Sequence, residues 1–189
     1  MNQERRKLLL ATMALPASNV LADEMSSEQL YEQLFWERDR KLTIVRTQTR
    51  ESCKDLVYFS KGKIIPDAYK QLCHLFRDVR ENTAIAINPR LFDAFYAGQA
   101  WMADHGFSRA WMINSGHRTR RTNAMTEGAS KDSSHLRGEA GDAWMQGVSV
   151  AYLGELYKQI KPNGVGIYLN KHFLHVDTDA SKGVRTWRG

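Results

Sequence analysis

The order of its helical and β-rich segments is the feature that most constrains the fold of this chain. Apolar residues recur at helical spacing early in the chain, over 26–40, 66–80 and 89–105. Short β-rich runs then gather in the second half, at 109–114, 139–146, 163–170 and 173–178, with one helical segment at 148–160 among them. Because helices and strands do not alternate regularly, we expect an α+β domain with a small central antiparallel sheet and helices packed on it.

Local signals sharpen the reading of the first half. Residues 42–50 are β-rich, and the Lys61-Gly62-Lys63 segment separates two short apolar runs within 56–65. The second pattern predicts a β-hairpin with its turn at Gly62. Pro66 and Pro89 each stand where a helix is expected to begin, a position that proline favours.

The N-terminus has the layout of an export signal. Arg5, Arg6 and Lys7 form a basic front, an apolar run follows over 8–17, and a plausible cleavage site ends at Ala22. The paired arginines leave open whether the route is twin-arginine or general export. We therefore expect an export signal at 1–22, a lead-in helix or linker at 23–41 and the main domain at 42–189, in a periplasmic protein.

Composition narrows the function classes. The chain of 189 residues has a net charge of +6, part of which belongs to the expected signal. A mild excess of positive charge suits an anionic cell-wall substrate or nucleic acid, and export argues against nucleic acid. No apolar run reaches 18 residues, so we expect no membrane-spanning helix.

The two cysteines exclude a site built of three or four thiolates. Because the protein is expected to be exported, Cys53 and Cys73 have access to an oxidising compartment. A hairpin between them would bring them close. Two readings stay open, a disulfide and a pair of buried thiols.

Two clusters of polar residues carry the chemistry. The first, SSHLRGEAGD, supplies His135 and Asp142, and the second, HFLHVDT, supplies His175. Imidazole and carboxylate are ligands that Zn²⁺ uses, and a catalytic zinc site needs three of them. Gly138 allows the chain to turn between His135 and Asp142. From these residues alone a metal site and ordinary structural histidines are both open.

Ordered motifs over about 42–187 resemble the zinc peptidoglycan peptidases of the D-alanyl-D-alanine carboxypeptidase type, in particular their MepK-like (YcbK-like) murein endopeptidase branch. The motif Ser-x-His-x-x-Gly-x-Ala-x-Asp is matched over 133–142, and Ser-Gly-x-Arg over 115–118. Further matches are Leu-x-Arg-Asp ending at Asp78, Gly-Val-Gly-x-Tyr over 164–168, His-Val-Asp-Thr over 175–178 and Val-Arg-x-Trp over 184–187.

The resemblance implies a zinc peptidase domain with the fold of the carboxypeptidase and hedgehog type, in which His135, Asp142 and His175 bind Zn²⁺. It also implies that Arg118 pairs with a substrate carboxylate. Ser133 then orients the loop or a water molecule, because no serine-hydrolase relay is apparent.

The chain differs from the family at the position expected to supply the general base. The family has an acidic residue three positions before the last ligand, where this chain has His172. Asp177 shares a strand face with His175 because the two are two residues apart. We therefore carry both His172 and Asp177 as candidate catalytic residues, with a role for Asp177 in holding a ligand imidazole also open.

The sequence as a whole predicts an exported zinc metallopeptidase that cleaves stem-peptide cross-links of peptidoglycan, and a monomer. The alternative is a peptidoglycan-binding protein that kept the fold and metal site but lost catalysis, and His172 motivates it. A sterol- or signal-type binding domain on the same fold is a remoter alternative. The sequence does not define which peptide bond is cut.

Overall fold

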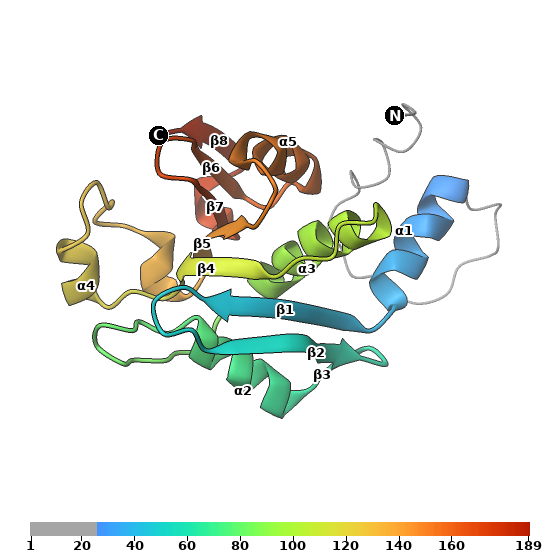
Figure 1. The fold of residues 1–189 in the computed structure, drawn as a ribbon, viewed down its shortest axis with the longest axis horizontal. Helices are drawn as coiled ribbons and strands as arrows, with labels where there is room; N and C mark the ends of the chain where they lie inside the picture. The colour runs from blue at the N-terminus through green and yellow to red at the C-terminus, as the bar shows by residue number, and fades with distance from the viewer. Residues whose placement is uncertain (1–25) are drawn as a thin grey trace.

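An eight-stranded sheet forms the centre of the computed structural model, which describes residues 26–189 (Figure 1). The strands in chain order are β1 (Arg40–Arg46), β2 (Ser52–Ser60), β3 (Lys63–Ile64), β4 (Trp111–Ser115), β5 (Ala140–Met145), β6 (Gly164–Tyr168), β7 (Phe173–Asp177) and β8 (Arg185–Arg188). They lie side by side in the order β3-β2-β1-β4-β5-β7-β6-β8.

Within residues 26–189, five α-helices and two short 3-10 helices accompany the sheet. They are α1 (Ser27–Glu37), α2 (Pro66–Leu75), α3 (Pro89–Asp104), α4 (Arg120–Ala124), α5 (Val150–Ile160), η2 (Ser134–Arg137) and η3 (Ala180–Lys182). Figure 1 shows α4 at one end of the sheet and α1 at the other. The expected export signal at 1–22 lies outside the described residues.

The predicted α+β class is confirmed, but the sheet is neither small nor purely antiparallel. β1 pairs with β4 in parallel, and β6 pairs with β8 in parallel. The first parallel pair arises because β2, β3, α2 and α3 separate β1 from β4 along the chain, which leaves room for a crossover. The second arises from β8, a strand that the sequence pattern did not predict.

Helices α2 and α3 begin at Pro66 and Pro89 as predicted, and side chains cap the starts of α1 and α3. Ser26 and Gln29 form a reciprocal capping box at the start of α1, and Asn88 caps α3 just before Pro89. The predicted helix from Pro66 is five residues shorter than expected, because the Asp78 carboxylate accepts hydrogen bonds from the N–H groups of Arg80 and Glu81. A side chain that bonds nearby backbone in this way competes with helix propagation.

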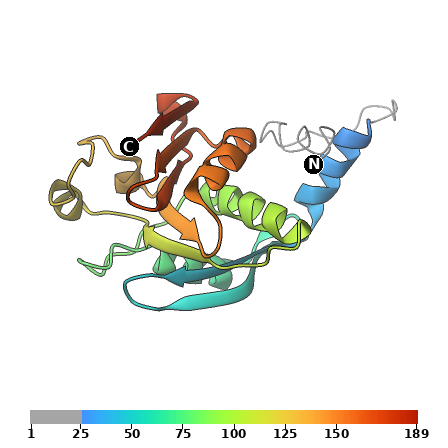
Figure 2. The ribbon, with the colours of Figure 1, turned by 45° about the horizontal axis from the view of Figure 1, so that its top comes forward.

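Alternation along the strands divides the sheet into a core face and an open face. A side chain at Gly141 of β5 would press against Phe76 and Phe95, so this residue faces the helices. Phe95 lies on α3 and packs edge-on against Trp111 of β4, and both are fully buried. Figure 2 shows α3 and α5 together on this side of the sheet. Asp142, the next residue after Gly141, therefore points to the opposite face.

The end of α1 is tied to the domain rather than standing free. Phe35 is buried, and its ring packs against Tyr96 of α3. Arg38 continues the contact by donating a hydrogen bond to the Tyr96 hydroxyl at 2.7 Å. None of the helices within 26–189 combines the length and apolar character needed to cross a bilayer.

The two cysteines are both buried free thiols, so the disulfide hypothesis is wrong and the alternative reading is confirmed. Cys53 on β2 donates to the carbonyl oxygen of Leu42, with 3.6 Å between sulfur and oxygen. Cys73 on α2 accepts from the N–H of Ile87 at 3.5 Å. Burial also raises the pKa of the Cys53 thiol, which keeps it protonated and unreactive.

We expect thiol titration of the protein, unfolded without reductant, to find two reactive thiols per chain. The reason is that each sulfur is buried in its own set of contacts. The same titration after reduction is the control and should give the same number. A value near zero before reduction would contradict this assignment.

Candidate metal centre

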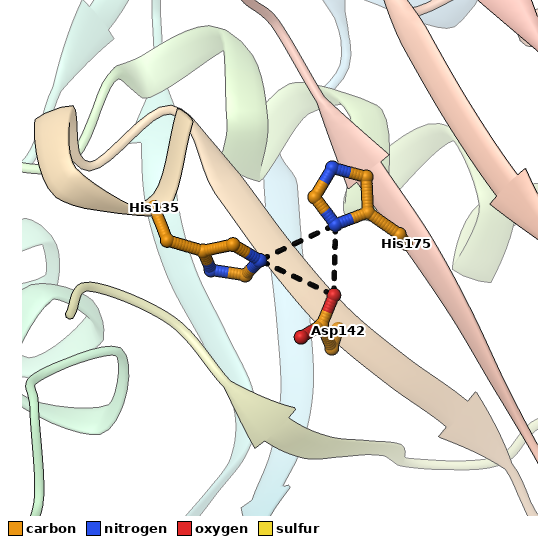
Figure 3. Close-up of side chains that lie close together, drawn as sticks. All are labelled: His135, Asp142 and His175. Carbon is orange, nitrogen blue, oxygen red and sulfur yellow. Dashed lines mark hydrogen bonds and ion pairs between the residues drawn. The ribbon is translucent and has the colours of Figure 1, made fainter. Parts of the chain in front are cut away.

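Three side chains from separate elements converge on the open face of the sheet (Figure 3). His135 Nε2 lies 3.3 Å from His175 Nδ1 and 3.3 Å from Asp142 Oδ1. His175 Nδ1 lies 2.8 Å from the same Asp142 oxygen. Within 26–189 this is the one group of three such side chains whose ligand atoms all lie within 4.8 Å of one another.

Strand register and one turn explain the convergence. Asp142 on β5 and His175 on β7 are direct antiparallel partners, so their side chains leave the same face. His135 comes from η2, which ends at Gly138 in a left-handed conformation with φ of 68°. That conformation is easy for glycine, and it turns the chain from η2 into β5.

The ring nitrogens that point away from the centre are held by the protein. His135 Nδ1 lies 2.6 Å from the carbonyl oxygen of Gly116. His175 Nε2 lies 3.1 Å from Asp177 Oδ2, and this carboxylate also accepts from Arg185 at 2.6 Å. Such outer partners fix the tautomer and orientation of metal-binding histidines. The arrangement therefore leaves one nitrogen of each ring directed at the centre.

Charge is balanced around the shared carboxylate. Burial alone would raise the pKa of Asp142, but the imidazoles of His135 and His175 hold it well below its usual range. Burial lowers the pKa of His135, whereas hydrogen bonds to Asp142 and Asp177 overcome burial and raise the pKa of His175 to about 8. Asp142 is thus ionised at neutral pH. Without a metal ion His175 carries a proton that a metal would have to displace.

The donor set fits a divalent metal ion. Two imidazole nitrogens and one carboxylate oxygen are the ligands of an open, three-residue catalytic site. The hydrogen bonds from His135 to Gly116 and from His175 to Asp177 orient the two rings, as outer partners do in such sites. The residues predicted as ligands are therefore together, in a geometry that can hold an ion.

Arg118 lies at the edge of this centre. Its Nη2 donates to Asp142 Oδ2 at 2.5 Å, and its Nε donates to the Ser115 hydroxyl at 2.9 Å. The predicted substrate-binding arginine is therefore bound to a predicted ligand. Within residues 26–189 its Nη1 makes no hydrogen bond or ion pair, so this nitrogen is the part left for another group.

Ser133 has a local structural task. Its hydroxyl accepts from the N–H of His135 at 3.3 Å and so caps η2. This contact orients the backbone that carries His135, as expected for a residue that shapes the loop. Ser133 is buried and makes no contact with a base that would activate a nucleophile.

Of the two candidate bases, Asp177 lies beside the centre and His172 does not join it. Asp177 is fully buried, with Oδ2 bound to His175 and Arg185 and Oδ1 accepting from the N–H of Asp179. His172 is exposed in the turn between β6 and β7, with φ of 52°. It stands three residues, or about 10 Å of extended chain, before His175.

Two supporting features escaped the sequence reasoning. Asp78 accepts from the N–H of Thr119 at 2.8 Å, and the Phe76 carbonyl accepts from the N–H of His117 at 2.7 Å. These bonds hold the loop that presents Arg118. The Leu-x-Arg-Asp motif contains both Phe76 and Asp78, but the motif alone does not indicate that these residues support the loop.

Trp187 of β8 forms a wall next to His175. The two ring centroids lie 5.3 Å apart, and a Cβ at Gly166 would come within 2.7 Å of the indole. Glycine is therefore required there for the indole to lie over the sheet. In the sequence, the Val-Arg-x-Trp motif is the feature that singles out Trp187.

Comparison with known proteins identifies the family. A family model described as "Peptidoglycan L,D-endopeptidase MepK" matches residues 36–187. The chain belongs to the MepK peptidase family.

Curated MepK-family relatives align over most of their length. The peptidoglycan L,D-endopeptidase MepK of Escherichia coli (strain K12) is 32% identical over 183 residues, covering 94% of this chain and 95% of the relative. The probable peptidoglycan L,D-endopeptidase MepK of Haemophilus influenzae (strain ATCC 51907 / DSM 11121 / KW20 / Rd) is 33% identical over 157 residues, covering 80% and 81%. No solved structure gave a significant match.

We expect Asp177→Ala to weaken metal binding by about 10- to 100-fold while the chain stays folded, because the variant loses the acceptor that orients His175. Metal affinity is measured by competition with a chromophoric chelator. Asp67→Ala, which removes an exposed carboxylate at the start of α2, is the matched control and should leave affinity unchanged. Unchanged affinity in Asp177→Ala would contradict the orienting role.

Proposed function

We propose that this protein is a zinc-dependent peptidoglycan endopeptidase that cleaves stem-peptide cross-links. The observation that carries the proposal is the convergence of His135, Asp142 and His175, with each histidine oriented by an outer acceptor. Membership of the MepK family supports the reaction class. The name of its relatives, L,D-endopeptidase, favours an L,D bond as the one cut.

Zn²⁺ is the ion we assign, because two imidazoles and one carboxylate form a usual catalytic zinc set. When bound, zinc supplies Lewis acidity toward a carbonyl oxygen and toward water. The protein holds the ligand rings through Gly116 and Asp177. It also keeps Asp142 ionised through Arg118 and the two histidines.

Arg118 is placed to act on both the centre and the substrate. One edge of its guanidinium holds Asp142 Oδ2 and Ser115, which fixes the plane of the group. A planar guanidinium fixed in this way can present its remaining N–H groups to a substrate carboxylate. Arg118 thus positions a ligand and binds substrate.

Asp177 is best described as a positioning residue. Both of its oxygens are engaged and its side chain is inaccessible, so it has no free lone pair facing the substrate side. We assign it the orientation of His175. His172 occupies the family's position for a general base, but it lies in an exposed turn away from the cluster, so we assign it no proton transfer.

The compartment follows from the reaction. Peptidoglycan lies outside the cytoplasmic membrane, and the layout of residues 1–22 fits an export signal. We therefore place the protein in the periplasm, acting as a monomer on stem peptides.

We expect His135→Ala, Asp142→Ala and His175→Ala each to lose zinc and turnover, because two ligands are too few for a tight site. Purified muropeptides are incubated with each protein, and products are identified by mass spectrometry. Chelator should abolish cleavage by the parent, and added Zn²⁺ should restore it. Metal content is measured in parallel.

The control is Asp67→Ala, which removes an exposed carboxylate at the start of α2, away from both the cluster and Arg118. It should keep zinc and turnover. Full zinc occupancy in any ligand variant would remove that residue from the ligand set. Zinc binding without cleavage of any muropeptide by the parent would establish the alternative, a peptidoglycan-binding protein.

We expect His172→Ala to keep turnover within about twofold of the parent, because His172 lies in an exposed turn away from the cluster. A residue acting as general base would instead cost about 10²- to 10⁴-fold. Steady-state turnover at full zinc occupancy decides between these outcomes. A loss of the larger size would restore His172 as the base.

A further inference from the structure

A large cavity opens beside the metal centre and shares one residue with it. Its volume is about 980 Å³, and α4, η2 and the segment between them form its walls. Arg118 lines the cavity and also contacts Asp142 of the centre. We call this cavity the basic pocket, and define it by Arg118, Arg120, Asn123, Lys131, Asp132 and Arg137.

Positive charge in the basic pocket exceeds the negative charge available to balance it. Arg118 is paired with Asp142, and Arg137 is paired with Asp132, Glu139 and Asp179. Arg120 and Lys131 have no ion-pair or hydrogen-bond partner anywhere in residues 26–189. Two cations are therefore left to face a ligand or solvent.

The walls that carry these two cations are tied together. Asn123 of α4 donates through Nδ2 to the carbonyl oxygen of Ser130 at 2.9 Å, next to Lys131. The Thr119 hydroxyl caps α4 by accepting from the N–H of Thr122 at 3.1 Å, next to Arg120. The N–H of Thr119 is itself held by Asp78. The pocket is therefore built before a ligand arrives, which reduces the ordering cost of binding.

We propose that the basic pocket binds free carboxylates of the stem peptide beside the scissile bond, so that the enzyme selects stems with free carboxylates over stems in which these are amidated. The inference rests on the proposed function and adds the substrate class that the site prefers. Arg118 contacts the carboxylate nearest the centre. Arg120 and Lys131 contact the next one.

The chemistry of the pocket favours this ligand. Stem peptides of peptidoglycan carry several free carboxylates, and guanidinium and ammonium groups are their natural partners. A carboxamide has the same shape but no charge, so it loses the ion pairing. The volume of about 980 Å³ accommodates several residues of a peptide.

The test uses two synthetic cross-linked stem peptides that differ only in bearing carboxylates or carboxamides. The zinc-loaded protein is compared with Arg120→Gln, Lys131→Gln and the double variant. The matched control is Lys63→Gln with Arg109→Gln, which removes one lysine and one arginine from β3 and from the loop before β4. Both sets remove the same net charge from exposed positions.

For the carboxylate peptide, we expect KM to rise about threefold in each single variant and about tenfold in the double variant, the size of exposed ion pairs. The value of kcat should stay near that of the parent. For the carboxamide peptide all variants should match the parent within about twofold. The control pair should change neither peptide, and zinc content and thermal midpoint should be constant.

Two outcomes overturn the proposal. Equal losses on both peptides would mean that the two cations do not recognise carboxylates. An equal loss in the control pair would mean that only the overall charge attracts the substrate.

Failure of the proposed function would appear differently. If the parent cleaves neither peptide, binding of each to the zinc-loaded proteins is measured by titration calorimetry. Selective binding of the carboxylate peptide, lost in the double variant, would support the pocket although the peptidase assignment fails. Equal binding of both peptides would overturn the pocket.

Discussion

The buried carboxylate of Asp142 is the constraint on which the site depends. An isolated carboxylate in such a position costs several kcal/mol, so it needs compensating partners. His135, His175 and Arg118 supply them, and each comes from a different element: η2, β7 and the loop between β4 and α4. Because all three elements must meet one carboxylate, their positions relative to the sheet are mutually fixed. The geometry of the candidate metal centre therefore follows from the need to compensate this one buried carboxylate.

How much the sequence could predict depended on whether the interaction was local. The family motifs predicted His135, Asp142 and His175 as one ligand set, whereas the strand register that places Asp142 opposite His175 is known only from the structure. The strand β8 was missed because Arg185, Thr186, Trp187 and Arg188 do not form an apolar pattern. Its pairing depends on the fit of Trp187 over Gly166, which are distant in sequence. His172 could not be placed because spacing alone does not reveal where a turn ends.

In α2 the apolar spacing of the sequence favours a longer helix, whereas the tertiary contacts of the residues that follow require the helix to end early. Apolar spacing continues to Val79, yet the helix ends at Leu75. Ending there frees the Phe76 carbonyl for His117 and turns Asp78 toward Thr119. Burial alone would raise the pKa of Asp78, but hydrogen bonds accepted from the backbone N–H groups of Thr119, Glu81 and Arg80 lower it, so it stays an anionic acceptor. Functional sites are where such departures from local preference are expected.

The loop 115–119 couples the metal centre to the basic pocket. Its Gly116 carbonyl holds the ring of His135, the N–H of Arg118 donates to the His135 carbonyl at 3.1 Å, and Thr119 begins the wall that carries Arg120. A change inside this loop would therefore disturb both the orientation of His135 and the start of the wall that carries Arg120. Arg120 and Lys131 lie beyond the loop and make no contact with the ligands. Under the proposed function, substitution of those two residues would change substrate preference without altering the three residues assigned to the ion.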